Sequence, residues 1–404
     1  MMPRTPAALA LALVAVLVIG SCSSDGGFGF GEPEPTATVA PELVVPLGEV
    51  PFDQPVTVEV QDGTIEAATV TSDGGEALDG EVADDRAHWV SADLPLPGAT
   101  YSVSTEVADE VGDPVTLTGS FVVAAVPDAR RLTLTLQPGD ADVVGVGAPI
   151  IVRFDQQVTE QAEVEAAMHV SSDPQVVGAW RWLSSTEAHF RPQEFWPAGT
   201  QVGVDLDLNG VRAGDDLWGG RAYTYQFTIG RAQVATVDAA AHTMTVSVDG
   251  TTVGTWDASL GRPEYATRNG TYVVLSKDAT RRMTSCGANI TCDKSSPEYY
   301  DLEVDWSVRL TNSGTFVHSA PWSVGSQGSA NVSHGCLNLS EANGQTYYEM
   351  AQYGDVVTVT NSTRGPEDLV ERGDPGMADW NLPWSEYIAG SALGQQVTTL
   401  PLAG

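Results

Sequence analysis

The sequence predicts a mainly β protein in which two similar sandwich domains precede a β-rich third domain with one main helix. Short segments such as "PVTVEV" (55–60) alternate apolar and polar residues with the period of a β-strand. A strand-rich pattern of roughly 100 residues occurs twice before residue 231. Beyond that point, one segment has both the start and the stop signals of a helix.

Composition sets the limits of this prediction. A chain of 404 residues is too long for one ordinary core, so several domains are expected. With 42% hydrophobic and 18% charged residues, the chain is globular rather than disordered. The net charge of −34 argues against a nucleic-acid partner, because binding phosphates requires a basic surface.

The two sandwiches are predicted at residues 43–125 and 126–230. "HWVSADLPLPGATYSV", starting at His88, is similar to "HFRPQEFWPAGTQVGV", starting at His189. Repeats of this length made of short strands are typical of immunoglobulin-like domains. Neither unit contains a cysteine, so the inter-sheet disulfide of antibody domains is absent. Four histidines have no ligand-like spacing and are interpreted as structural: His88, His169, His189 and His242.

The third domain is predicted at residues 231–404, including a C-terminal tail. Asp249-Gly250 is a hairpin turn dipeptide between two strand-like segments. The one clear helix follows Ser340 as its N-cap and stops near Gly354.

The N-terminus has the pattern of an export signal. Its apolar run, residues 7–19, is shorter than the roughly 20 residues that a membrane span needs. The run ends in "IGSC", which resembles a bacterial lipobox with Cys22 as the lipidated residue. Residues 1–22 are therefore expected to be a lipoprotein signal peptide, and the Gly/Pro-rich residues 23–42 a flexible tether. This organisation predicts an exported protein, lipid-anchored at the outer face of the cytoplasmic membrane.

The remaining cysteines differ in their surroundings. Cys286 and Cys292 have five residues between them and are expected to form a disulfide in an exported chain. Cys336 is left unpaired among polar neighbours, which favours a reactive thiol over a buried structural one.

The segment "HSAPWSVGSQGSANVSHGCLN" brings His318 and His334 close to this thiol in the sequence. Either imidazole is a candidate to take the thiol proton or to pair with the thiolate as imidazolium. Backbone amides around Gly335 and Cys336 are candidate donors to a developing oxyanion. A zinc site of these two histidines and the cysteine stays open as an alternative, although no fourth ligand is evident. No cofactor is expected.

The same segment resembles the active-site signature of YkuD-type L,D-transpeptidases, through "HSAPW" (318–322) and "SHGCLN" (333–338). The lipobox, the two immunoglobulin-like domains and the tail with "DWNLPW" (379–384) are similar to the actinobacterial lipoprotein form of that family. The resemblance implies an enzyme that cleaves the terminal D-Ala from a peptidoglycan tetrapeptide stem. It then transfers the acyl group to a diaminopimelate amine of a neighbouring stem, which gives a 3→3 cross-link. Carbapenems are the β-lactams expected to acylate such a site.

The resemblance also assigns roles. Cys336 would be the nucleophile and His318 its general base, oriented by the backbone carbonyl of Ser319. His334 and Gly335 would shape the oxyanion site with the Cys336 amide. The expected substrate-binding residues are Tyr300, Met283, Trp322 and Asn338, with Met283 on a lid over the site.

Two alternatives remain. A sortase-like transpeptidase needs an arginine after the cysteine, and only Arg364 and Arg372 follow Cys336, neither in a strand-like context. A wall-binding lipoprotein with an inactive Cys336 is the non-enzymatic alternative.

Overall fold

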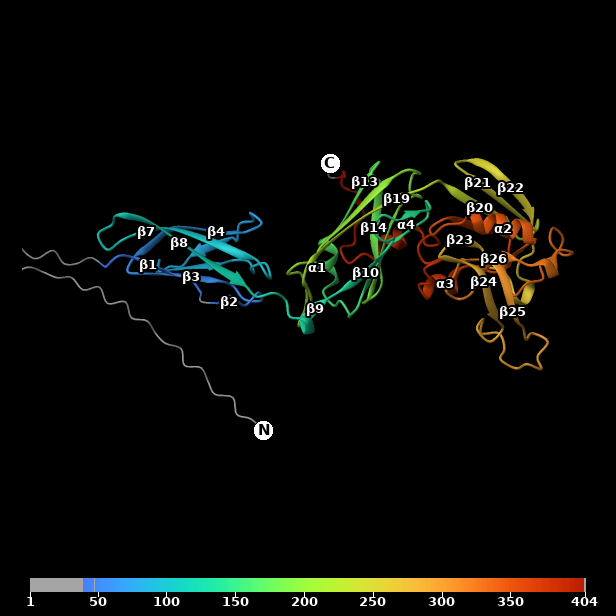
Figure 1. The fold of residues 1–404 in the computed structure, drawn as a ribbon, viewed down its shortest axis with the longest axis horizontal. Coiled ribbons are helices and arrows are strands. Elements are labelled where there is room, and N and C mark those ends of the chain that lie inside the picture. Colours follow the sequence, from blue (N-terminus) through green and yellow to red (C-terminus); the bar gives the residue numbers. More distant parts are fainter. Residues whose placement is uncertain (1–38, 47, 403–404) are drawn as a thin grey trace, which may run out of the picture.

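The computed structural model describes residues 39–46 and 48–402. The three domains follow one another along the long axis of the molecule, with the first sandwich at one end and the third domain at the other (Figure 1). The predicted export signal (1–22), its Cys22 and the tether up to residue 38 lie outside the described residues. None of the helices in the described ranges is long and apolar enough to cross a membrane.

The first sandwich consists of two four-stranded sheets, in the orders β1-β3-β6-β5 and β2-β8-β7-β4. Alternate residues of β7 are buried, as the sequence pattern predicts. Trp89 is 2% exposed and belongs to the core. The strands are β1 (Glu42–Val44), β2 (Glu49–Val50), β3 (Thr57–Gln61), β4 (Thr64–Ser72), β5 (Gly80–Val82), β6 (His88–Ser91), β7 (Thr100–Ala108) and β8 (Pro114–Val123).

The second sandwich repeats this plan. In each sandwich a two-residue strand pairs in parallel with the last strand, β2 with β8 and β11 with β19. Its sheets have the orders β10-β12-β15-β14-β29, β11-β19-β16-β13 and β17-β18-β9, where β29 (Val397–Thr398) comes from the C-terminal tail. The elements are η1 (Asp128–Arg130), β9 (Arg131–Leu132), β10 (Leu134–Gln137), β11 (Val143–Val144), β12 (Ile150–Phe154), α1 (Gln161–Ala166), β13 (Met168–Asp173), β14 (Val177–Ser184), β15 (Glu187–Pro192), β16 (Gln201–Asp207), β17 (Arg212–Gly214), β18 (Leu217–Gly219) and β19 (Ala222–Ile229).

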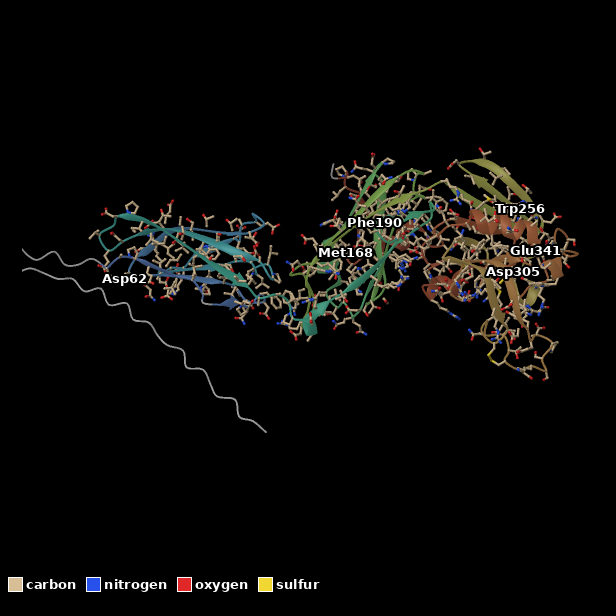
Figure 2. The ribbon with its side chains drawn as sticks, in the orientation of Figure 1. Asp62, Met168, Phe190, Trp256, Asp305 and Glu341 are labelled. Carbon is tan, nitrogen blue, oxygen red and sulfur yellow. A yellow bond between two sulfur atoms is a disulfide. The ribbon has the colours of Figure 1, made fainter. Side chains whose placement is uncertain are left out.

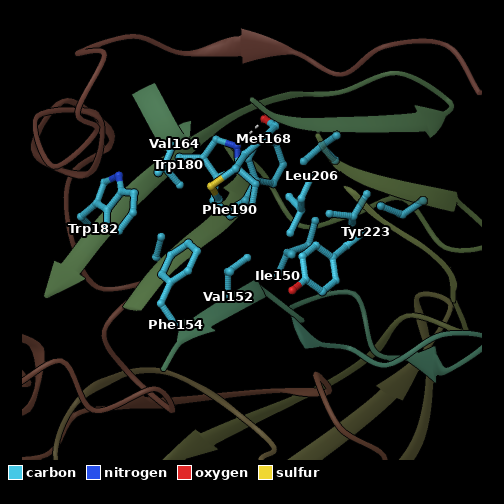
Figure 3. Close-up of a cluster of buried hydrophobic side chains, with 14 of the residues drawn as sticks. Ile150, Val152, Phe154, Val164, Met168, Trp180, Trp182, Phe190, Leu206 and Tyr223 are labelled. Atoms are coloured by element: carbon cyan, nitrogen blue, oxygen red, sulfur yellow. Dashed lines mark hydrogen bonds between the residues drawn. The ribbon is translucent and has the colours of Figure 1, made fainter. Parts of the chain in front are cut away.

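Aromatic side chains fill the space between the sheets of the second sandwich. Trp180 and Phe190 pack with ring centroids 5.4 Å apart, beside Ile150 and Leu206 (Figure 3). Met168 and Phe190 mark this domain in Figure 2, where Trp256, Asp305 and Glu341 mark the third domain. Each of the three domains has its own cluster of buried apolar residues, as expected for separate cores.

The third domain is built on two sheets, in the orders β22-β21-β20-β28-β23 and β24-β25-β26-β27. The hairpin turn at Asp249-Gly250 has positive φ at both residues, as predicted. The elements are β20 (Gln233–Asp238), β21 (Thr243–Val248), β22 (Thr251–Asp257), η2 (Pro263–Tyr265), β23 (Gly270–Val273), β24 (Ser276–Thr284), β25 (Asp301–Arg309), β26 (Phe316–Ser319), η3 (Pro321–Ser323), β27 (Leu337–Leu339), α2 (Glu341–Met350), β28 (Val356–Thr360), α3 (Glu367–Glu371), α4 (Trp384–Ile388) and β29 (Val397–Thr398).

The predicted main helix is α2, the longest helix of the described residues. The Ser340 side chain accepts a hydrogen bond from the Asn343 amide at 3.3 Å, which confirms the predicted N-cap. The helix ends at Met350, four residues before Gly354. With mainly β domains and one main helix, the predicted fold class is confirmed.

The C-terminal tail returns to the second sandwich (Figure 1), where β29 extends a sheet by pairing with β14. Asp379 in the tail accepts a hydrogen bond from the buried His189 at 2.9 Å. The Arg191 guanidinium lies 4.3–4.9 Å from three ring centroids of the tail, those of Trp380, Trp384 and Tyr387. The tail therefore joins the second and third domains, and His189 is structural, as predicted.

Candidate active site

Two short parallel strands carry the candidate nucleophile and base. His318 lies on β26, opposite Asn338 of β27, and Cys336 directly precedes β27. All residues of both strands are buried, which fixes their backbones. Helix α2 packs across them, with Gly344 so close to β26 that an added Cβ would lie 2.9 Å from the Ser319 nitrogen.

His318 is held in one tautomer. Its Nδ1 donates a hydrogen bond to the Ser319 carbonyl oxygen at 2.7 Å, the contact that the resemblance predicts. Nε2 is then the unprotonated nitrogen that can accept a proton. The side chain is 4% exposed, and burial lowers the pKa of the imidazole to about 4. His318 is therefore neutral at physiological pH, as a general base must be.

Cys336 is the one free cysteine in the described part of the chain. Burial raises the pKa of its thiol to about 11, and Sγ lies 3.6 Å from the Gly314 carbonyl oxygen. The thiol and the imidazole are thus both neutral in the resting site. Of the two possibilities that the sequence leaves open, this favours proton transfer during attack over a preformed thiolate–imidazolium pair. The predicted Cys286–Cys292 disulfide is present.

The turn before Cys336 is held by two hydroxyl groups. Ser333 Oγ accepts from the Gly335 amide at 3.0 Å and donates to the Cys336 carbonyl at 2.7 Å. Thr267 Oγ1 donates to the Gly335 carbonyl at 3.0 Å. Gly335 has φ +118, which a residue with a side chain rarely adopts. In this resting site the Gly335 amide bonds to Ser333 Oγ, and its role in the oxyanion site stays a prediction.

His334 projects toward the lid, the segment 285–300 between β24 and β25. Its Nε2 lies 2.8 Å from Glu298 Oε2 and 3.2 Å from Arg262 Nη2. Arg262 also forms an ion pair with Glu298. The hydrogen bond from His334, followed by that from Arg262, lowers the pKa of the Glu298 carboxyl.

The His334 ring lies between Tyr265 and Tyr300, with centroids 4.9 and 5.2 Å away. These contacts give the His334 side chain a role that the sequence did not indicate, the fixing of the lid. Glu298 and Arg262 have no local signal in the sequence, because their positions matter only after the lid folds over His334.

One cavity of about 360 Å³, the first cavity, brings the predicted site together. Its walls include the nucleophile, both histidines and all four predicted substrate-binding residues: Cys336, His318, His334, Met283, Tyr300, Trp322 and Asn338. The other two predicted catalytic residues, Ser319 and Gly335, do not line this cavity. A cavity of this size accommodates a few residues of a peptide.

The predicted substrate residues differ in their settings. Met283, predicted on the lid, lies on β24 just before the segment 285–300, and Trp322 is 60% exposed. Burial and the nearby Cys336 raise the pKa of Tyr300 to about 12, so its hydroxyl stays protonated. Asn338 is 3% exposed and donates to Ser323 Oγ at 3.2 Å. Its Oδ1 is buried without a hydrogen-bond partner in the described residues.

No group of three or more His, Cys, Asp or Glu side chains in the described residues could hold a metal ion. The zinc alternative therefore has no ligand set in this part of the chain.

Comparisons with known proteins agree on the class of this site. Residues 232–359 match the model of the L,D-transpeptidase catalytic domain, and residues 48–212 that of a bacterial Ig domain. L,D-transpeptidase 2 of Mycobacterium tuberculosis is 36% identical over 344 residues, 85% of this chain and 82% of the relative. L,D-transpeptidase 5 of the same species is 33% identical and covers 84% of this chain and 73% of the relative. The solved structure of LD transpeptidase LdtMt1 in complex with imipenem is 36% identical with a TM-score of 0.50, and covers 57% of this chain and 99% of that one.

Proposed function

The chain belongs to the L,D-transpeptidase family, and from that premise we propose how Cys336 and His318 build a cross-link in peptidoglycan. The enzyme is a transpeptidase with a cysteine nucleophile. Its donor is a tetrapeptide stem, from which it releases the terminal D-Ala. Its product is a 3→3 cross-link to a diaminopimelate amine of a second stem.

Acylation needs one base and one oxyanion donor. The thiol of Cys336 attacks the carbonyl carbon of the third stem residue, while His318 Nε2 takes the thiol proton. The carbonyl oxygen becomes an oxyanion, and the Cys336 amide, which makes no hydrogen bond to a side chain of the described residues, faces it. The bond to D-Ala then breaks, and His318 returns the proton to the leaving amine.

Deacylation repeats these steps with the acceptor amine. Its nitrogen attacks the thioester, His318 takes a proton from it, and the C–S bond breaks. The sulfur recovers the proton from His318, which restores the neutral pair. The resting pKa values near 4 and 11 make this proton shuttle necessary, because neither group ionises by itself at neutral pH.

The observation that carries the proposal is the 2.7 Å hydrogen bond from His318 Nδ1 to the Ser319 carbonyl, in the same cavity as Cys336. It leaves Nε2 free to act as a base. We test the proposal by incubating residues 43–404 with a tetrapeptide stem and measuring product masses. The proposal is supported by a dimer of two stems that lacks one D-Ala and in which the third residue of one stem is bonded to the third residue of the other. D-Ala release without a dimer at any acceptor concentration contradicts transpeptidation.

Inhibition by carbapenems is part of the same proposal. A related enzyme has been solved in complex with imipenem, and a strained β-lactam carbonyl suits a thiol with a neighbouring base. Imipenem should form an adduct that maps to Cys336 and to neither lid cysteine. Cys336→Ser should abolish the adduct, and an adduct that persists in this variant would contradict the assignment.

Anchoring rests on the sequence alone. "IGSC" with Cys22, followed by a Gly/Pro-rich tether, supports lipidation and a place at the outer face of the cytoplasmic membrane. Cys22→Ala should release the protein from membranes without loss of transpeptidase activity in solution. Continued membrane attachment of this variant would count against the anchor.

A further inference from the structure

Cys336 lines two cavities. Besides the first cavity, it borders a second cavity of about 260 Å³, and Tyr300 and His334 also line both. A substrate held at the thiol can therefore extend in two directions. Cys336 is therefore part of the wall of the second cavity, to which the proposed mechanism assigns no substrate group.

The lining of the second cavity is cationic. Arg268, Arg364 and Arg372 contribute to it, and no Asp or Glu of the described residues does. This is unusual for a chain with 53 acidic and 19 basic residues. Arg364 and Arg372, the two arginines that follow Cys336 in the sequence, flank helix α3.

Asp368 is the carboxylate that forms ion pairs with Arg268 and Arg364. Asp368 accepts two hydrogen bonds from Arg268, one of them at 2.6 Å, and a third from Arg364 at 3.0 Å. The hydrogen bond from Arg268, together with the charges of Arg364 and Arg372, lowers the pKa of Asp368. Arg372 forms no ion pair in the described part of the chain. With three guanidinium groups and no carboxylate among the residues that line it, the cavity wall carries an excess of positive charge.

Another part of the wall is the loop that the lid disulfide closes. Ala288, Asn289 and Ile290 lie between Cys286 and Cys292 and line this cavity, whereas the first cavity has no residue from the loop. The disulfide therefore shapes the second cavity specifically. This gives the lid cysteine pair a function that the catalytic residues do not explain.

The chemistry of the reaction indicates which group fits there. The amine that leaves in acylation belongs to an amino acid whose carboxylate is on the adjacent carbon. By microscopic reversibility the attacking amine occupies the same place relative to the thioester. A guanidinium cluster is suited to bind a carboxylate in two-point hydrogen bonds.

We propose that the second cavity is a carboxylate subsite, in which Arg364 and Arg372 bind the terminal carboxylate of the D-Ala that the donor stem loses. Identifying the carboxylate with D-Ala rests on the function proposed above, whereas the anion preference of the cavity does not. The tests below separate the two.

The first test measures alkylation of Cys336 by iodoacetate and by the neutral iodoacetamide. The double variant Arg364→Gln/Arg372→Gln should lower the ratio of the iodoacetate rate to the iodoacetamide rate about threefold to tenfold. Charges at a cleft change the local concentration of an anion by such factors. Arg221→Gln, a surface substitution with the same chemical change in the second sandwich, should leave the ratio unchanged. An unchanged ratio in the double variant overturns the subsite. Equal melting temperatures establish that both variants are folded.

The second test compares tetrapeptide donors that end in D-Ala carboxylate or in D-Ala carboxamide. The wild type should lose at least about tenfold in kcat/KM with the carboxamide, and the double variant should process both donors equally slowly. Equal rates for both donors in the wild type refute the assignment to D-Ala. If the wild type cleaves neither donor, the proposed function fails, and the alkylation ratio still decides whether the cavity prefers anions.

Discussion

Gly344→Ala tests how the position of His318 depends on helix α2. Gly344 is buried against β26, and an added Cβ would lie 2.9 Å from both Cβ and the nitrogen of Ser319. Carbon atoms in contact need about 3.5–4.0 Å, so helix and strand must separate by roughly 0.5–1 Å. The Ser319 carbonyl that accepts the His318 Nδ1 hydrogen bond belongs to the backbone that would move.

The expected effect on stability is small, whereas the effect on activity is large. Overpacking costs about 1–3 kcal/mol, and replacing glycine inside a helix returns about 1 kcal/mol. A misplacement of about 1 Å at a catalytic group, in contrast, lowers the rate by about 10²-fold. Gly344→Ala should therefore lose roughly 10-fold to 100-fold in kcat and remain folded.

The assay combines thermal unfolding with the rate of D-Ala release. Gln345→Ala is the matched control, because this neighbour on the same helix is exposed and its side chain bonds, among the described residues, only to Glu349. It should keep wild-type kcat. Wild-type kcat in Gly344→Ala would refute the reasoning that the helix positions the base through Ser319.

Four other predictions concern the charges and the lid. The kcat/KM for the tetrapeptide should fall as the pH drops through about 4 and show no transition near 8.5, because burial lowers the His318 pKa to about 4 and raises the Cys336 pKa to about 11. A transition near 8.5 would indicate that the Cys336 thiol is exposed. Burial lowers the pKa of His318 from 6.5 to about 4, so the unfolded chain takes up the proton at a higher pH than the folded chain. His318 therefore lowers the free energy of unfolding as the pH falls from 6.5 to 4. Urea unfolding of His318→Gln should show a smaller loss of stability over that pH range. Glu298→Gln should raise KM about threefold to tenfold and leave the rate of Cys336 alkylation by iodoacetamide unchanged. The control Glu303→Gln, at an exposed residue, should leave KM unchanged. Equal KM values for the two variants would show that the hydrogen bond between Glu298 and His334 does not hold the lid. Reducing the lid disulfide should lower the turnover rate and leave the melting temperature nearly unchanged, because a bond that closes so short a loop removes little entropy from the unfolded chain. A large drop in melting temperature with an unchanged turnover rate would contradict this.

The sequence predicted those parts of the site whose geometry is local. Ser319 follows His318 directly, so the hydrogen bond between them needs only an extended strand end. Gly335 adjoins the nucleophile and adopts the positive φ that such a turn requires. The repeated strands and the N-cap at Ser340 were also readable, because alternation and capping depend on neighbours in the chain.

Contacts between distant segments were not predictable in this way. Glu298 and His334 are 36 residues apart and meet only after the lid folds. Asp379 is 190 residues from His189, and no pattern in the tail indicates that it returns to the second sandwich. The hydrogen bond from the Gly335 amide to Ser333 Oγ was missed for a different reason. The motif shows which groups are near one another in the chain, but not which amide will donate to the Ser333 hydroxyl.

The central claim is that Cys336 forms the acyl-enzyme with His318, and not His334, as its base. The most direct measurement is the rate at which a tetrapeptide stem acylates the protein in a single turnover, followed by intact mass and by mapping of the modified residue. We predict an adduct on Cys336 equal to the stem without its D-Ala, formed about 10²–10⁴-fold more slowly in His318→Gln and much less affected in His334→Gln. A dead His334→Gln beside a nearly normal His318→Gln, or an adduct at another residue, would contradict the account.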